Sequence, residues 1–113
     1  MTIDVYTDGA CLGNPGPGGW GFVVDQGLWA SGFDSHTTNQ RMELMAASAA
    51  VQALDGPLRV HSDSTYVVNC FVQEWWKGWL KRDWKNSKKE PVANRDLWEP
   101  FIELVNGRGN VEF

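Results

Sequence analysis

The stretch that constrains the fold most is residues 37–56, TTNQRMELMAASAAVQALDG. Its five alanines favour a slim helix, and the Gly56-Pro57 pair predicts where that helix stops. Thr37 followed by Gln40 fits a capping box, so we expect a helix over 37–55. Because this helix is apolar on most sides, it must be buried, and a sheet is the surface most able to cover it.

Strand patterns flank the helix on both sides. Residues 2–8 alternate, with Ile3, Val5 and Thr7 on one face. Residues 19–25 and 28–35 form two further predicted strands, with a turn near Gln26-Gly27, and three strands so close in sequence indicate an antiparallel meander. Residues 58–63 and 110–113 are the fourth and fifth predicted strands.

This order of elements predicts an α/β fold in a single domain, residues 1–113. The crossover helix sets the fourth strand parallel to the first, which brings Asp8 and Asp63 to the same carboxyl end. A second helix is predicted from about Ser64, with apolar rows at i,i+4 spacing that continue to Leu80. A third is predicted over 97–107, with Pro100 in about its first turn.

Three carboxylates are candidates for a shared site, although two of them have ordinary structural alternatives. Asp8 precedes a glycine, and Asp-Gly is common in turns. Asp63 precedes a helix, where an N-cap or first-turn anion is favourable. Glu43 would be the sixth residue of a helix capped by Thr37, beyond capping reach, and a carboxylate on a buried helix needs a partner.

Three converging carboxylates repel one another unless a cation holds them. All-oxygen ligands suit Mg²⁺, with Mn²⁺ as a substitute, rather than zinc. Carboxylate-held Mg²⁺ indicates phosphate chemistry. The glycine-rich residues 13–19 have no Lys-Ser/Thr after them, so we interpret them as a hairpin loop that a nucleic-acid backbone can approach closely.

Residues 75–95, called the basic segment below, carry seven lysines and arginines against two acidic residues. The chain has a net charge of −4, so the remainder of the chain is strongly acidic, and the contrast indicates a local footprint for a polyanion. Trp75, Trp76 and Trp79 lie on the apolar rows and are expected in the core. Trp84 lies beyond those rows, where it could stack on a sugar or base or shield lysine stems. The lysines alone could also form a solvated face.

Cys11 and Cys70 do not form a CxxC pair, and two cysteines are too few for a disulfide scaffold. We therefore expect a reducing, cytoplasmic location. No basic-then-apolar leader and no apolar run near 18 residues is present, so neither a signal peptide nor a membrane span is expected.

Four motifs in order resemble those of type 1 ribonuclease H in its bacterial form: YTDGACLGNPGPGGWG, TTNQRMELMAA, HSDSTYVV and NRDLW. The resemblance runs from residue 3 to the end of the chain. It implies a mixed five-stranded sheet, antiparallel in strands 1–3 and parallel in strands 4–5, with helices on both faces. It also implies endonucleolytic hydrolysis of the RNA strand of RNA–DNA hybrids with two Mg²⁺ ions, leaving 3′-hydroxyl and 5′-phosphate ends.

The resemblance also implies roles for individual residues. Asp8, Glu43 and Asp63 match three of the four catalytic, metal-binding carboxylates of the family. Thr38 matches a residue that helps to seat a DNA phosphate, and Thr65 stands where many members carry glutamine. The positions that match hybrid contacts or the family's "basic handle" are Cys11, Asn14, Asn39, Gln40, Trp79, Lys81, Arg82, Trp84, Lys85, Lys88 and Lys89. Contacts of this kind need no base-specific readout, so we expect little sequence preference and strong salt dependence.

The sequence departs from the family at its end. Phe113 falls inside the fifth strand, before the family's fourth metal-binding aspartate, its loop histidine and its last helix. Three alternatives follow: an active hybrid nuclease, a hybrid-binding module or fragment with weak or no catalysis, and an interaction domain whose carboxylates cap turns and helices. A full-length domain is expected to be a monomer, whereas an apolar sheet surface exposed without the last helix would favour self-association or a partner segment.

Overall fold

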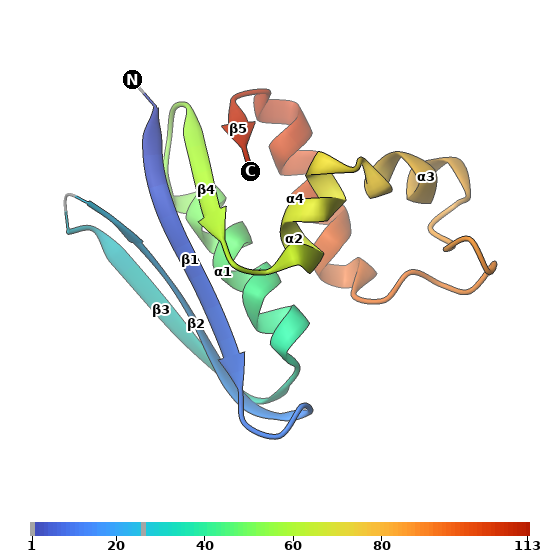
Figure 1. Ribbon diagram of the computed structural model, residues 1–113, viewed down its shortest axis with the longest axis horizontal. Helices are drawn as coiled ribbons and strands as arrows, with labels where there is room; N and C mark the ends of the chain where they lie inside the picture. Colours follow the sequence, from blue (N-terminus) through green and yellow to red (C-terminus); the bar gives the residue numbers. More distant parts are fainter. Residues whose placement is uncertain (1, 26) are drawn as a thin grey trace.

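The computed structural model describes residues 2–25 and 27–113. Five strands form one sheet in the order β3-β2-β1-β4-β5, and the helices gather on one side of it (Figure 1). The elements in chain order are β1 (Ile3–Cys11), β2 (Gly16–Val24), β3 (Trp29–Thr37), α1 (Asn39–Ala53), β4 (Leu58–Ser62), α2 (Thr65–Val72), α3 (Trp75–Lys81), α4 (Arg95–Arg108) and β5 (Val111–Glu112). The mixed five-stranded sheet predicted from the sequence is confirmed, whereas the helices of the described residues lie on one face of it and not on both as expected.

The sheet has the predicted pairing, but its first strands are longer than predicted. β1, β2 and β3 form an antiparallel meander, and β1–β4 and β4–β5 are parallel. β1 continues through Gly9 to Cys11, which pairs with Gly18. The interpretation of Asp8-Gly9 as a turn is therefore wrong, and the connecting loop shrinks to residues 12–15. Gly27 lies in the β2–β3 turn, whereas Gln26 is outside the described residues.

Helix α1 covers the sheet as predicted, but its cap lies one residue later than expected, and the helix spans Asn39–Ala53 rather than 37–55. The side-chain oxygen of Thr38 accepts from the backbone N–H of Arg41 at 3.2 Å and caps the helix. Thr37 is instead the last residue of β3 and is buried, so the capping box of Thr37 and Gln40 is wrong. Glu43 becomes the fifth helical residue. The buried residues of α1 are Met42, Leu44, Ala46, Ala47, Ala50 and Val51.

The second helix is two helices rather than one. Glu74 adopts a left-handed backbone conformation with φ 57°, which ends the α2 segment and starts α3 in a new direction. The i,i+4 rows could not reveal this break, because the apolar spacing continues across it. Trp75, Trp76 and Trp79 still pack against the core, although each is only half-buried.

Helix α4 begins at Arg95, two residues before the predicted start, so Pro100 lies in its second turn rather than its first. Arg108 at its end donates to the carbonyls of Val51 at 2.6 Å and Leu54 at 2.7 Å, and also to that of Gly56. One guanidinium thus satisfies the carbonyls that the end of α1 leaves free. The β5 strand is two residues long, shorter than predicted.

The two faces of the sheet differ sharply. Val5 and Thr7 of β1 are buried toward α1, as the alternation predicts. On the opposite face, a row of side chains crosses four strands, and Trp29, Val23 and Tyr6 in it are 67%, 45% and 45% exposed. The apolar sheet surface expected from the sequence is therefore present. Among residues 2–25 and 27–113, no helix is long and apolar enough to cross a bilayer.

Candidate active site

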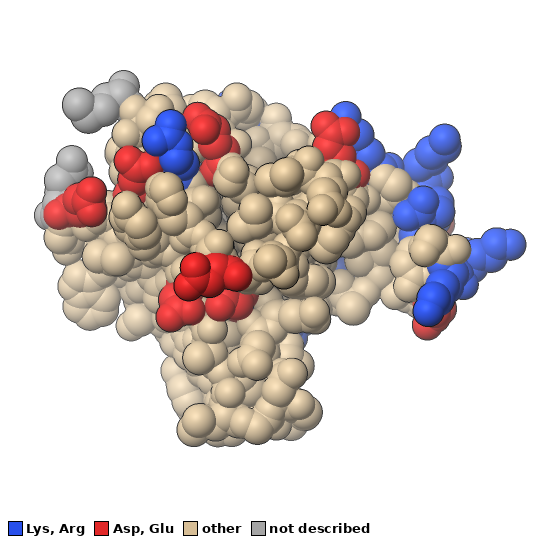
Figure 2. Space-filling model, viewed as in Figure 1, with Lys and Arg blue, Asp and Glu red and all other residues tan. Residues whose placement is uncertain are grey.

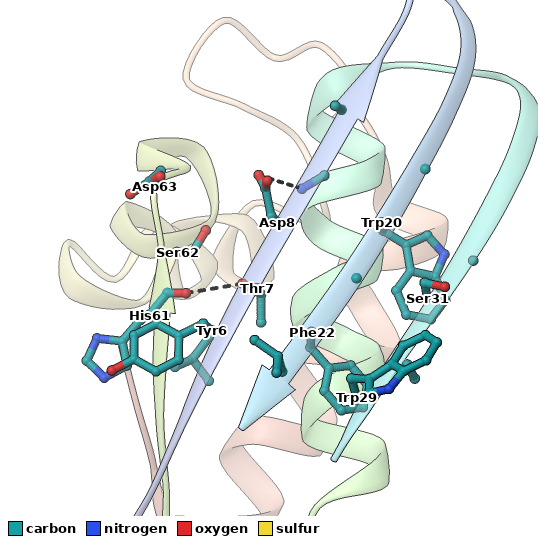
Figure 3. A pocket seen from close by; sticks show the side chains of 18 of the residues that line it. Tyr6, Thr7, Asp8, Trp20, Phe22, Trp29, Ser31, His61, Ser62 and Asp63 are labelled. Carbon is teal, nitrogen blue, oxygen red and sulfur yellow. Dashed lines mark hydrogen bonds between the residues drawn. The ribbon is translucent and has the colours of Figure 1, made fainter. Parts of the chain in front are cut away.

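The paired part of β1 and β4 ends just before the two aspartates. Thr7 and Ser62 are the last partners of this parallel ladder, so Asp8 and Asp63 each come directly after the last β1–β4 pair. Figure 3 shows both carboxylates at the end of the region where β1 and β4 run side by side, with Asp63 at the end of β4. Both residues are exposed. Asp63 is not an N-cap, because the side chain of Ser64 accepts from the N–H of Val67 and caps α2.

Gly9 brings β1 against α1 at the height of Glu43. A Cβ atom at Gly9 would lie 2.4 Å from the backbone carbonyl carbon of Met42 and 2.5 Å from the backbone nitrogen of Glu43. No side chain larger than hydrogen fits there. The close approach of the two backbones sets Glu43 beside Asp8, whose carboxylate accepts from the N–H of Gly9 at 3.0 Å.

The environment of Glu43 combines burial with nearby negative charge. Burial raises the pKa of its carboxyl, the N–H of Gly9 acts in the opposite direction, and the negative charges of Asp8 and Asp63 raise it further. Within the described part of the chain, its buried Oε2 has no hydrogen-bond partner. A buried, unpaired carboxylate oxygen within electrostatic reach of two more carboxylates is the kind of donor that suits a hard divalent cation.

The three carboxylates do not form a complete set of metal ligands in this structure. Over residues 2–25 and 27–113, no three His, Cys, Asp or Glu side chains lie close enough together to hold a metal ion. Mutual repulsion is the physical reason that like charges stay apart. Asp8 and Asp63 thus lie within electrostatic reach of Glu43, but the three carboxylates do not form a closed ligand set among the described residues.

Asp8 and Asp63 lie at one end of an open concavity of about 1270 Å³ on the uncovered face of the sheet. Tyr6 and His61 line it side by side, with ring centroids 4.7 Å apart (Figure 3). The Nε2 atom of His61 lies 2.8 Å from a carboxylate oxygen of Asp4, and this contact holds the pKa of Asp4 below its usual value. Nothing in the local sequence marks His61 and Asp4 as a pair, because they lie 57 residues apart.

The predicted hybrid-contact residues of the first two motifs meet beside the start of α1. The side-chain oxygen of Asn14 accepts from the N–H of Asn39 at 2.9 Å. The thiol of Cys11 donates to the carbonyls of Thr37 at 3.3 Å and Gly16 at 3.4 Å. The Asn14 bond connects the β1–β2 loop to α1, whereas the Cys11 thiol contacts the start of β2 and the end of β3. Six of the predicted contact residues are at least partly exposed in this region or at the start of α2, namely Cys11, Asn14, Thr38, Asn39, Gln40 and Thr65.

The basic segment projects from the body of the molecule. Figure 2 shows its Lys and Arg side chains gathered over α3 and the loop after it, away from the acidic patch in the middle of the view. Asn86 closes the loop, since its side-chain oxygen accepts from the N–H groups of Lys88 at 2.9 Å and Glu90 at 3.0 Å. The predicted contact residues that are exposed here are Lys81, Arg82, Lys85, Lys88 and Lys89, and Trp79 is half-buried.

The prediction that Trp84 contacts the hybrid is wrong. Its side chain is 6% exposed, so it is not available to stack on a sugar or base. Left-handed conformations at Asp83 and Trp84 fold the chain back, and the N–H of Trp84 donates to the carbonyl of Trp79 at 2.7 Å. The ring packs 5.9 Å from that of Trp79, with the guanidinium of Arg95 5.2 Å from its centroid. Trp84 anchors the basic segment to the core.

Comparison with known proteins decides the family. The model of the RNase H family matches residues 1–113. The chain belongs to the ribonuclease H family. The prediction of a ribonuclease H enzyme is therefore confirmed at the level of the family, and the site lies on a fold that the family shares.

Ribonuclease H proteins of two bacteria are close in sequence to this chain. The relative from Symbiobacterium thermophilum is 53% identical, over 91% of this chain and 74% of its own length. That from Moorella thermoacetica is 49% identical, over 98% of this chain and 76% of its own length. The chain thus spans about three quarters of these ribonuclease H relatives. Among solved structures, LC11-RNase H1 in complex with an RNA/DNA hybrid matches with a TM-score of 0.73 and 25% identity, covering 98% of this chain and 82% of that one.

Proposed function

We propose that this chain hydrolyses the RNA strand of RNA–DNA hybrids, with Asp8, Glu43 and Asp63 as the catalytic carboxylates. The observation that carries the proposal is Glu43, whose buried Oε2 has no hydrogen-bond partner among the described residues and whose carboxyl lies within electrostatic reach of both aspartates. Family membership and a neighbour solved with a hybrid support the substrate.

In this proposal the three carboxylates would hold divalent ions, Mg²⁺ or Mn²⁺, in a two-ion arrangement. Bound ions of this kind activate the attacking water and stabilise the leaving oxygen, which gives 3′-hydroxyl and 5′-phosphate ends. The protein's part is to hold negative charge where the β1–β4 ladder ends, while the packing of Gly9 against α1 brings Glu43 near Asp8.

Substrate binding is assigned to two surfaces. The exposed side chains at the start of α1 and the adjoining β1–β2 loop would follow sugars and phosphates of the hybrid, and the basic segment would add a phosphate footprint. We retain the cytoplasm as the location and a monomer as the state of a full-length domain. Self-association through the open sheet face remains a prediction for the chain as given.

The test is incubation of the chain with a labelled hybrid and Mg²⁺. We expect cleavage of the RNA strand, inhibited by a chelator and lost in Asp8→Asn. Cleavage that Asp8→Asn leaves unchanged would overturn the assignment of the site. Saturable stabilisation by Mg²⁺ in a melting experiment, abolished by Glu43→Gln, checks the metal separately from activity.

A second candidate function is hybrid binding with weak or no catalysis. It is favoured by one observation: among the described residues no three metal-binding side chains are close enough together to hold an ion. Tight, salt-sensitive hybrid binding without turnover supports this function. Sustained turnover by a preparation whose intact mass corresponds to 113 residues rejects it.

A further inference from the structure

The two surfaces assigned to the hybrid are far apart in sequence, yet a continuous set of polar contacts joins them. We propose that Arg41, Tyr66, Asn94 and Asp96, called the α1–α4 brace, are positioning residues that hold the start of α1 and the basic segment in one binding geometry. This inference rests on the proposed function. The brace acts through the surfaces that it joins rather than by contact with the reacting atoms.

The first contact of the brace is a two-pronged ion pair. Both terminal nitrogens of Arg41 donate to the carboxylate of Asp96, at 3.0 and 2.8 Å. Paired bonds of this geometry fix orientation as well as distance, which a lysine at the same place cannot do. Arg41 follows directly after Thr38, Asn39 and Gln40, so the ion pair fixes the first turn of α1 to the first turn of α4.

Asn94 uses both ends of its amide inside the protein. Its oxygen accepts from Arg41 at 3.2 Å, and its nitrogen donates to the hydroxyl of Tyr66 at 3.1 Å. Its backbone is left-handed, with φ 62° and ψ 27°, a conformation that asparagine tolerates better than most residues. Asn94 therefore sets the point at which the chain leaves the basic segment and enters α4.

Tyr66 carries the brace into the aromatic core below the basic segment. Its hydroxyl accepts from the indole N–H of Trp98 at 2.7 Å, and Trp98 is fully buried. The ring of Trp98 lies 5.4 Å from that of Trp79, which packs in turn against Trp84. Packed contacts thus run without a gap from the start of α1 to the anchor of the basic segment.

The negative charge of Asp96 distinguishes a positioning role from a purely electrostatic one. Its carboxylate is 64% exposed beside surfaces that bind a polyanion. By charge alone, Asp96→Asn would strengthen hybrid binding, because it removes a negative group. A positioning role predicts the opposite sign. Glu99→Gln makes the same change of charge three residues away on α4, where the partner of Glu99 among the described residues is Arg95 of the same helix, at 3.1 Å.

The experiment measures the Kd of the 113-residue chain for a labelled RNA–DNA hybrid by fluorescence anisotropy, in EDTA and at several salt concentrations. We expect Asp96→Asn and Tyr66→Phe to weaken binding about three- to tenfold, the range in which residues of a coupling network act. The slope of log Kd against log salt should stay unchanged, because no phosphate contact is lost. Glu99→Gln should bind as tightly as wild type or more tightly.

Two further variants separate positioning from stability and from direct contact. Val105→Ala removes buried side-chain volume from α4 away from the brace, and its Kd should not change. The exchange Arg41→Asp with Asp96→Arg should recover at least half of the affinity that Asp96→Asn loses, whereas a phosphate-binding Arg41 would not tolerate an aspartate in its place.

The outcomes are distinct. A wild-type chain that binds the hybrid no better than single-stranded RNA of equal length overturns the proposed function. A wild-type chain that binds the hybrid, with Asp96→Asn binding as tightly as Glu99→Gln, overturns the brace alone. Equal weakening in Val105→Ala at matched melting temperature also overturns it, because general stability would then explain the effect.

Discussion

The carboxylate site and the basic segment carry charge of opposite sign, and the fold treats them in opposite ways. At the carboxylate site, like charges are held near one another by backbone packing, with Gly9 against α1 and Glu43 half-buried. In the basic segment the cations are exposed, and the buried parts are aromatic, above all Trp84 at 6% exposed. The carboxylate site fixes the positions of its charged groups. In the basic segment, only the backbone and the aromatic anchor are fixed, and the charged side chains extend from them into solvent.

This difference has a functional consequence. Where positions are fixed, the loss of one group should remove activity with little effect on stability or binding. Where charges are only displayed, each group should contribute a small increment to binding, and the aromatic anchor should carry the stability. The following variants test that division, beginning with the largest expected effect.

Asp63→Asn should reduce the rate of hybrid cleavage by at least about a hundredfold, because removing a charged group that acts on the transition state has a cost of this order. Hybrid binding in EDTA should be equal or slightly tighter, since the change removes a negative charge. Cleavage rates and anisotropy on the same preparation check both parts. A parallel loss of binding and cleavage would show that the carboxylate acts in substrate binding and not in the reaction.

Trp84→Ala should destabilise the fold by about 3–5 kcal/mol, the usual cost of truncating a buried aromatic side chain. Lys85→Ala, its exposed neighbour, should stay within about 0.5 kcal/mol of wild type. Urea unfolding followed by tryptophan fluorescence measures both. Similar stabilities for the two variants would contradict the role of Trp84 as an anchor.

Lys85→Ala, Lys88→Ala and Lys89→Ala should each weaken hybrid binding modestly. Each lysine that contacts a phosphate should lower the slope of log Kd against log salt by about 0.9. Cleavage at saturating hybrid should be unchanged, because these side chains lie away from the carboxylates. A variant with a normal Kd and a lower rate at saturation would break the division between the two regions.

The smallest expected effect is a pH dependence at Asp96. The hydrogen bonds from Arg41 hold the pKa of Asp96 below its usual value of 3.8. A depressed pKa in the folded state means that stability is gained above the usual value and lost as pH falls through the lower one. The difference in melting temperature between wild type and Asp96→Asn should therefore be constant near neutral pH and vanish in acid. For so exposed a group it should correspond to less than about 1 kcal/mol. A difference that grows in acid contradicts the pairing.

Much of the fold was accessible from the sequence, because the signals there are local. The alternation around Val5 predicts β1, and the alanine-rich residues of α1 predict its burial. The parallel crossover predicts that Asp8 and Asp63 share one end of the sheet. These inferences use periodicity and chain order, which depend on few long-range contacts.

What the sequence could not predict depends on backbone turns and distant partners. The left-handed turns at Glu74 and Trp84 redirect the chain without altering its apolar spacing. Thr37 and Thr38 are both competent caps, and the last pairing of β3 decides between them. Arg41 and Asp96 are 55 residues apart, so nothing in the local pattern marks them as a pair.

The most direct test of the account labels both strands of an RNA–DNA hybrid and follows each with the 113-residue chain, its intact mass verified, with Mg²⁺ and with a chelator. The account predicts cleavage of the RNA strand alone, dependent on Mg²⁺ and abolished in Glu43→Gln, with the DNA strand and a matched DNA duplex intact. Cleavage that survives Glu43→Gln, or equal cutting of both strands, would contradict it.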